Sequence, residues 1–161
     1  MSSYSEEVGI QTEDFSIQTE YERLKRKTAN QAGAICTFTG LVREFGDKPD
    51  IQGLFLEHYP GMTEHNLQQI VDEANGRWPL LDVVVVHRVG KLSLNEQIVF
   101  VGVSASHRAE AFSACDYIMD YLKSRAAFWK KETTANQSQW VSAKETDELS
   151  LARWHTSNEC S

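Results

Sequence analysis

The sequence is poor in the residues that build covalent or metal-bound frameworks. Its 161 residues include only 3 cysteines and 3 prolines. The cysteines, Cys36, Cys115 and Cys160, stand far apart and form no CxxC pair. An odd and scattered set of this kind is typical of reduced thiols, so we expect neither a disulfide framework nor a zinc site. No apolar run approaches the roughly 20 residues of a membrane-spanning helix, so no membrane segment is predicted.

Positive charge is also scarce. The formal net charge is −7, which argues against broad contact with nucleic acid or anionic membranes, because either would need a large basic surface. A small basic pocket is still compatible with this balance. The first residues contain no apolar signal core, so we expect a cytoplasmic protein.

The motifs that hold metals, nucleotides or common nucleophiles are missing as well. The histidines show no HxxxH spacing, and the sequence contains no GxGxxG, P-loop or GxSxG motif. Cys115 falls on the apolar stripe of a predicted helix and is a poor nucleophile there. His58 and His87 fall in strand patterns and are interpreted as structural residues. The sequence therefore predicts no metal and no cofactor.

What the chain does contain is a set of helix and strand patterns sufficient for one domain. We divide it into a flexible arm at 1–14, one domain at 15–145 and a peripheral tail at 146–161. The order of elements is not a regular βαβ alternation, which predicts an α+β fold with a mixed or antiparallel sheet. Thr63 and Ser106 are the expected N-caps of two helices. Periodicity predicts helices at 16–28, 63–78 and 106–124, strands at 32–43, 51–58, 81–89 and 97–106, and two short strands after 125.

A basic and aromatic stretch, MDYLKSRAAFWKKE at 119–132, contains Lys123 and Lys130. Its cations could simply stabilise a helix C-terminus, each by roughly 0.3–1 kcal/mol. They could also line a pocket for an anionic substrate, and the spacing alone favours the helix end. On one helix the two lysines would lie roughly 10 Å apart along the axis, whereas a strand that folded back after Ser124 would bring them closer. Desolvation or a neighbouring cation would lower the pKa of a lysine and suit it to acid–base or nucleophilic work.

Three further cations stand at the ends of predicted elements. Arg43 closes the first long strand, and His107 and Arg108 fall in the first turn of the helix after Ser106. Cations are disfavoured at a helix N-terminus, where the dipole is positive. An anion would compensate, and free backbone N–H groups with Arg108 would cradle a phosphate. Both side chains could equally turn outward into solvent, and charge placement alone does not separate these interpretations.

Six longer strings carry a further signal: TFTGLVR (37–43), LEHYPGMT (56–63), VDEANGRWP (71–79), HRVG (87–90), EQIVFVGVSASHR (96–108) and MDYLKSRAAFWKKE (119–132). Together they resemble one family, the large catalytic subunit of molybdopterin synthase. The similarity runs in order from about Ala32 to Ala143.

The resemblance implies a sulfurtransferase with a hammerhead-type α+β fold and a small extra β subdomain. Such an enzyme inserts two sulfurs into cyclic pyranopterin monophosphate (precursor Z) and forms the dithiolene of molybdopterin, in molybdenum cofactor biosynthesis. The sulfur comes from a thiocarboxylate on the C-terminal Gly-Gly of a small ubiquitin-like subunit. Two large subunits form a homodimer at the centre of a heterotetramer, with one small subunit at each end. No nucleic acid or membrane partner is implied.

The resemblance also implies roles for individual residues. Lys123 and Lys130 match the lysines regarded as catalytic, and the pocket can draw on both subunits of the dimer. We assign Lys123 the acid–base role and the contact to the thiocarboxylate tail, and Lys130 the stabilisation of developing charge. We expect Arg43 and the helix start at His107 and Arg108 to hold the phosphate. Ala127 stands where many members have proline, a departure that affects stiffness and not chemistry. The residues expected to bind substrate are Leu41, Val42, Arg43, His107, Arg108, Lys123, Lys130, Lys131 and Glu132.

Two other classes of function fit the same residues. The chain could be a binding module that docks a ubiquitin-like tail without chemistry, which a sulfur-transfer assay would separate from an enzyme. It could also form a lysine Schiff base with a phosphorylated carbonyl compound, which borohydride trapping would reveal. Without the resemblance, the residues indicate an α+β domain with a small anion pocket.

Overall fold

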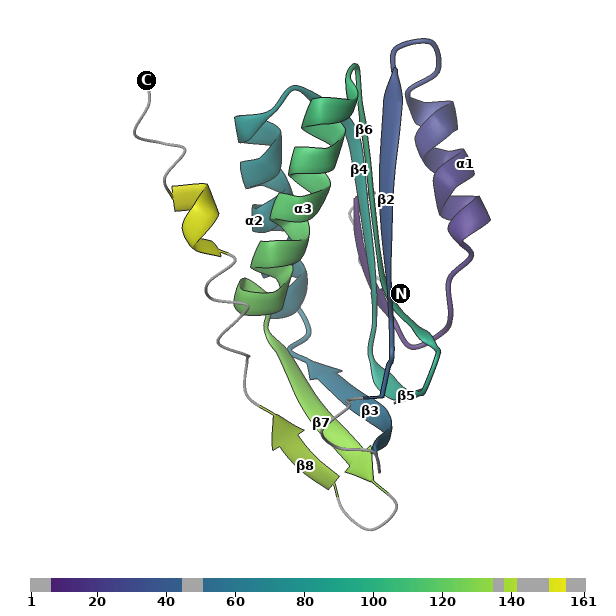
Figure 1. Ribbon diagram of the computed structural model, residues 1–161, viewed down its shortest axis with the longest axis vertical. Helices are drawn as coiled ribbons and strands as arrows, with labels where there is room; N and C mark the ends of the chain where they lie inside the picture. The colour runs from purple at the N-terminus through teal and green to yellow at the C-terminus, as the bar shows by residue number, and fades with distance from the viewer. Residues whose placement is uncertain (1–6, 45–50, 135–137, 142–150, 156–161) are drawn as a thin grey trace.

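The computed structural model describes residues 7–44, 51–134, 138–141 and 151–155 (Figure 1). It contains three long helices and two four-stranded sheets within those residues. In chain order the elements are β1 (Val8–Gln11), α1 (Ile17–Lys27), β2 (Ala34–Leu41), β3 (Ile51–His58), α2 (Met62–Arg77), β4 (Leu80–Arg88), β5 (Gly90–Ser93), β6 (Gln97–Ala105), α3 (Arg108–Arg125), β7 (Phe128–Thr134) and β8 (Ser138–Val141).

The main sheet has the strand order β1-β4-β6-β2, with β1 parallel to β4 and the other pairs antiparallel. Helix α1 covers one face, and α2 and α3 cover the other (Figure 1). The alternation of side chains along a strand explains this double cover. Val84 and Phe100 are buried together with Leu24 of α1, whereas Val83 and Val101 belong to the larger core beneath α2 and α3. The central strands are therefore apolar on both faces.

The second sheet has the order β5-β3-β7-β8 and is antiparallel throughout. It lies at the end of the main sheet where β4 passes into β5 (Figure 1). Leu54, Leu56 and Leu92 of this sheet are buried in the same core cluster as the residues beneath α2 and α3. The predicted α+β class, the mixed sheet and the extra β subdomain are confirmed.

The N-terminal arm differs from the prediction. Residues 8–11 form β1, in which Val8 and Ile10 are buried against the main core. The guanidinium of Arg88, itself buried, donates hydrogen bonds to the carbonyl oxygen of Thr12 at 3.2 and 3.1 Å. A four-residue strand is too short for its alternation to stand out, so this part of the expected flexible arm was wrongly assigned.

Both expected helix caps also differ from the structure. Helix α2 begins after Gly61, whose φ of 88° suits glycine and whose N–H donates to Glu64 at 2.6 Å. Helix α3 begins after His107, one residue beyond Ser106. Thr63 lies inside α2 and is fully buried. It is therefore not the N-cap of this helix.

The segment expected to be a peripheral tail contains a helical turn at 151–155. Trp154 packs at 5.9 Å from the ring of Trp78 and 5.3 Å from that of Tyr117. Its indole N–H donates to Asp120 at 2.5 Å, so this turn is attached to α2 and α3.

Candidate active site

Helix α3 and its N-cap carry three of the predicted site residues, with His107 at the cap and Arg108 and Lys123 in the helix. Its buried stripe, which includes Ala111, Cys115 and Ile118, packs against β6 and β2 and fixes the helix along the sheet. His107 and Arg108 stand exposed at its start, and Lys123 stands exposed near its end. At 1.5 Å per residue, His107 and Lys123 lie roughly 24 Å apart along the axis.

Arg43 lies at the same end of the molecule as Lys123. Strand β2 runs antiparallel to β6, so its last residues lie beside the start of β6. Helix α3 leaves the end of β6 and returns along the sheet, which brings its C-terminus to that same end (Figure 1). The backbone before Arg43 is firmly held, because Val42 donates to Glu96 at 2.9 Å and accepts from Asn95 at 2.7 Å.

Of the two residues before Arg43, Val42 is buried and Leu41 is half exposed, at 3% and 49%. Leu41 is therefore available to a ligand or partner, whereas Val42 serves mainly to fix the backbone.

Lys130 lies on β7, beyond the end of α3. It is paired with Leu56 of β3 and with Val141 of β8, and it is half-buried. Cross-strand partners share a face of the sheet, so Lys130 lies on the face that buries Leu56. Strand β7 continues away from the end of α3 and does not fold back beside it (Figure 1). The two lysines therefore belong to different elements, which excludes the single-helix arrangement.

Lys131 and Glu132 follow on β7, in register with Phe55 and Leu54 of β3. Their side chains lie outside the part of the chain that the structure describes, so their expected roles stay predictions.

His87 of the main sheet packs against the first residue of β7 in the second sheet. Its ring stacks on that of Phe128 with centroids 3.9 Å apart and an interplanar angle of 20°. Burial lowers the pKa of His87 to about 4, so the ring is neutral at neutral pH. Its Nδ1 lies 2.8 Å from the carbonyl oxygen of Arg88 and donates to it, since a carbonyl can only accept. The interpretation of His87 as a core residue is confirmed.

Cys115 is poorly placed to act as a nucleophile. Cys115 is buried and its thiol lies 4.0 Å from the carbonyl oxygen of Val101. Burial raises the pKa of the Cys115 thiol, which makes it a weak nucleophile. His58 lies 3.4 Å from Glu64, a contact at the start of α2 that suits a structural residue.

The predicted residues therefore form two groups. The lysine end contains Arg43, Lys123 and Lys130, and the arginine end contains His107 and Arg108. Within one chain the length of α3 separates these groups, so a ligand the size of a pterin cannot touch both. The expectation that Arg43 joins His107 and Arg108 of its own chain at one phosphate is therefore wrong.

The structure also reveals exposed apolar residues that sequence patterns missed. Phe112 lies beside the buried stripe of α3 in the helical pattern, yet it is 63% exposed. Phe38 and Leu41 on the edge strand β2, beside α3, are 41% and 49% exposed. An apolar residue next to a buried stripe gives no local signal of its exposure.

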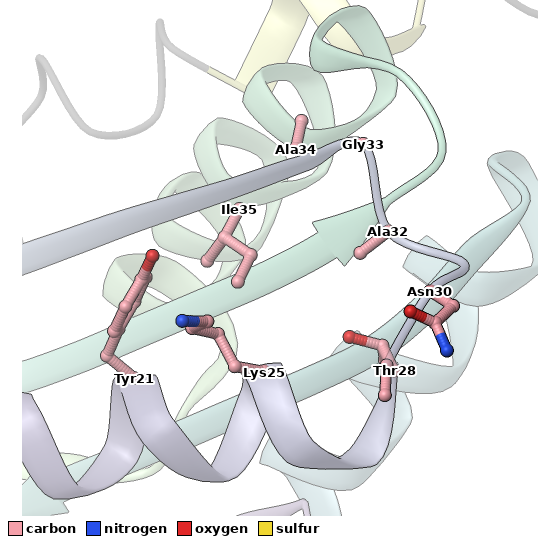
Figure 2. Close-up of a pocket in the computed structure, with 9 residues that line it drawn as sticks. Tyr21, Lys25, Thr28, Asn30, Ala32, Gly33, Ala34 and Ile35 are labelled. Atoms are coloured by element: carbon pink, nitrogen blue, oxygen red, sulfur yellow. The ribbon is translucent and has the colours of Figure 1, made fainter.

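A separate hollow of about 480 Å³ lies between α1 and the start of β2 (Figure 2). The side chains of Tyr21 and Lys25 both lie on the side of α1 that faces Ile35 (Figure 2), and the Lys25 ammonium is 5.8 Å from the Tyr21 ring centroid. None of the predicted site residues lines this hollow. The hollow is therefore separate from both groups of predicted site residues.

Two further properties concern only the described residues. No group of three or more histidine, cysteine or acidic side chains there could hold a metal ion. No helix in that part of the chain is long and apolar enough to cross a membrane.

The fold and the placement of these cations define a class: an α+β protein with cation-lined surfaces at both ends of one helix, suited to small anionic ligands. The family model described as MoaE protein matches residues 10–125. The molybdopterin synthase catalytic subunit of Vibrio cholerae is 51% identical over 147 residues, which cover 91% of this chain and 97% of the relative. The chain therefore belongs to the MoaE family.

Solved structures agree with this assignment. The molybdopterin biosynthesis MoaE protein of Burkholderia ambifaria matches with a TM-score of 0.80 and 47% identity, over 92% of this chain and 97% of the other. Molybdopterin synthase of Staphylococcus aureus matches with a TM-score of 0.76 and 33% identity, over 83% and 95%. The predicted family, fold class and enzyme class, a sulfurtransferase of molybdopterin synthesis, are confirmed.

Proposed function

We propose that this chain binds cyclic pyranopterin monophosphate and inserts two sulfurs into it, forming the molybdopterin dithiolene. The sulfur would come from the thiocarboxylated C-terminus of a small ubiquitin-like subunit. Family membership supports the reaction. The observation that carries the assignment of residues is the gathering of Arg43, Lys123 and Lys130 at one end of α3, with His107 and Arg108 at the other.

Each complete site is composite and draws on two copies of the chain. The midpoint between residues 107 and 123 is residue 115. A two-fold axis that passes beside α3 at this level, perpendicular to the helix, would place the arginine end of one copy beside the lysine end of the other. Phe112 lies within one turn of that midpoint and is largely exposed. The homodimer would bury this residue and assemble two identical sites.

The arginine end holds the phosphate of the substrate. His107 is the N-cap of α3, and its side chain makes no capping hydrogen bond. The N–H groups of the first turn are thus available to an anion, and the helix dipole favours negative charge there. The Arg108 guanidinium adds charge-assisted hydrogen bonds. A bound phosphate would therefore offset the unfavourable interaction of His107 and Arg108 with the positive end of the helix dipole.

The lysine end carries out the sulfur transfer. A thiocarboxylate that attacks a side-chain carbon of the pterin requires a proton donor for the departing oxygen, and Lys123 supplies the proton. Lys130 and Arg43 offset the negative charge that two anionic reactants bring together. Water then releases the spent tail as a carboxylate. The chain needs no sulfur of its own, in agreement with the buried, weakly nucleophilic Cys115.

We also infer that the protein acts in the cytoplasm. The two described cysteines, Cys36 and Cys115, are free thiols, and free thiols are typical of reducing compartments.

The test is reconstitution from purified parts. This chain, a thiocarboxylated small subunit and precursor Z are mixed, and the dithiolene is quantified. Formation of dithiolene with consumption of two thiocarboxylates per product supports the proposal. Tight binding of the small subunit without dithiolene would instead identify a docking module.

A further inference from the structure

Thr63 has an unusual role for a residue in the first turn of a helix. Its side chain is fully buried, with a relative exposure of 0%. The hydroxyl oxygen accepts a hydrogen bond from the N–H of Tyr59 at 2.9 Å. The same hydroxyl donates its proton to the carbonyl oxygen of Ala127 at 2.8 Å. The one proton of the hydroxyl is thus committed to a residue far away in the sequence.

Ala127 occupies the joint between the two lysine-bearing elements. Helix α3 ends at Arg125, Ala126 is extended, and β7 starts at Phe128. Lys123 lies four residues before Ala127 and Lys130 three residues after it. Any rotation of the backbone at Ala127 therefore changes the position of one lysine relative to the other.

The other polar side-chain contacts at this joint are more exposed. Asn66 donates to the carbonyl oxygen of Arg125 at 3.3 Å on the surface. The Arg125 guanidinium contacts both carboxylate oxygens of Glu73, at 2.6 and 3.0 Å, but both side chains are more than a third exposed. Exposed ion pairs of this kind contribute little, because solvent screens them. The Thr63 hydroxyl is buried, and its hydrogen bond to Ala127, at 2.8 Å, is shorter and less exposed than that of Asn66 to Arg125. It is therefore the firmer of these two contacts to the backbone between α3 and β7.

We propose that Thr63 is a positioning residue for the pair Lys123 and Lys130. Its hydroxyl fixes the Ala127 carbonyl and thereby sets the angle at which β7 leaves α3. The inference rests on the proposed function, since it assigns to the joint the task of holding both lysines at one substrate. Thr63 itself does not contact the substrate.

The test compares three variants in the reconstituted complex. Thr63→Val keeps the shape but removes the hydroxyl, Thr63→Ser keeps the hydroxyl, and Thr28→Val is the matched control. Thr28 is also a buried threonine whose hydroxyl donates to a carbonyl, that of Leu24 at 2.7 Å, but at the end of α1. Rates are measured at saturating precursor Z, together with KM, small-subunit affinity and Tm.

The expected result is a selective loss of turnover. Thr63→Val lowers kcat about tenfold to a hundredfold, because a misplacement of about 1 Å is enough for such a loss. Its KM and its affinity for the small subunit stay within about threefold of wild type, since the arginine end and the outer surface are unchanged. Thr63→Ser recovers most of kcat. Thr28→Val lowers Tm by a similar amount but leaves kcat unchanged.

Three outcomes would overturn the inference: wild-type kcat in Thr63→Val, equal loss in Thr63→Ser, or equal loss in Thr28→Val. If Thr63→Val does not fold, Asn66→Ala gives the test through the neighbouring carbonyl, with an expected decrease in kcat of about threefold and no decrease as the contrary result. Lys123→Ala in the same assay separates the two proposals. An inactive Lys123→Ala with an active Thr63→Val removes only the positioning role, whereas an active Lys123→Ala removes the proposed site.

Discussion

The two ends of α3 differ in how much of a site each provides. At the lysine end, Lys130 is half-buried beside Leu56, and the joint behind it is held by the stack of His87 on Phe128 and by the buried hydroxyl of Thr63. At the arginine end, His107 and Arg108 are exposed at the start of the helix. The lysine end is therefore ordered by its own chain, whereas in the proposed composite site the arginine end gains its function from a second copy.

Removal of Lys123 is expected to have the largest effect. Lys123→Ala should lower the rate of dithiolene formation by about a hundredfold to ten-thousandfold, the usual contribution of a general acid or base. Small-subunit affinity, measured by calorimetry, should change by less than about threefold, because a loss of one exposed contact is small. Lys25→Ala, at the hollow beside α1, is the matched control and should remain fully active. A Lys123→Ala enzyme with more than half of the wild-type rate would contradict the assignment.

Removal of Arg108 tests the arginine end. It should weaken the binding of precursor Z and leave the chemical step unchanged. Loss of a charge-assisted hydrogen bond to phosphate should raise KM for precursor Z about tenfold to a hundredfold. The rate at saturation and the affinity for the small subunit should stay close to wild type. Steady-state kinetics over a wide range of substrate concentrations distinguish the two variants. If Arg108→Ala also released the small subunit, its place in the phosphate site would be wrong.

Acid should destabilise the protein near the lysine end, because the buried His87 ring stacks on Phe128 in its neutral form. The pKa of about 4 in the folded protein lies below the ordinary value of about 6.5, so the neutral ring contributes stability above about pH 6.5. That contribution is lost as the pH falls towards 4, because the unfolded chain takes up the proton first. Between pH 7 and 4.5 the loss from this group should be about 2 kcal/mol.

Urea unfolding of wild type and His87→Gln at both pH values measures this loss. The wild type should lose more stability than the variant, since both share all carboxylates. Equal losses in the two proteins would show that His87 does not titrate as its burial requires.

Much of the difference between the two ends of α3 could be predicted from the sequence. The apolar stripe of α3 and the basic residues at its ends were visible, and so were the buried strands beneath it. Strand β1 was missed because four residues carry too short an alternation. The packing of Trp154 on Trp78 and the bond from Thr63 to Ala127 were missed because both join segments far apart in the chain. The exposure of Phe112 depends on where the edge of the sheet ends, which no local pattern indicates.

The composite site can be tested directly with dimers of defined composition. One dimer pairs a Lys123→Ala subunit with an Arg108→Ala subunit, and the other pairs a wild-type subunit with one carrying both substitutions. The two copies of each dimer carry different affinity tags, and rates are measured at low precursor Z. In the first dimer one site keeps both its lysine and its arginine, so about half of the wild-type rate is expected, and in the second both sites are damaged, so the rate should be near background. The reverse result, an inactive first dimer and a half-active second, would show that each site lies within a single chain.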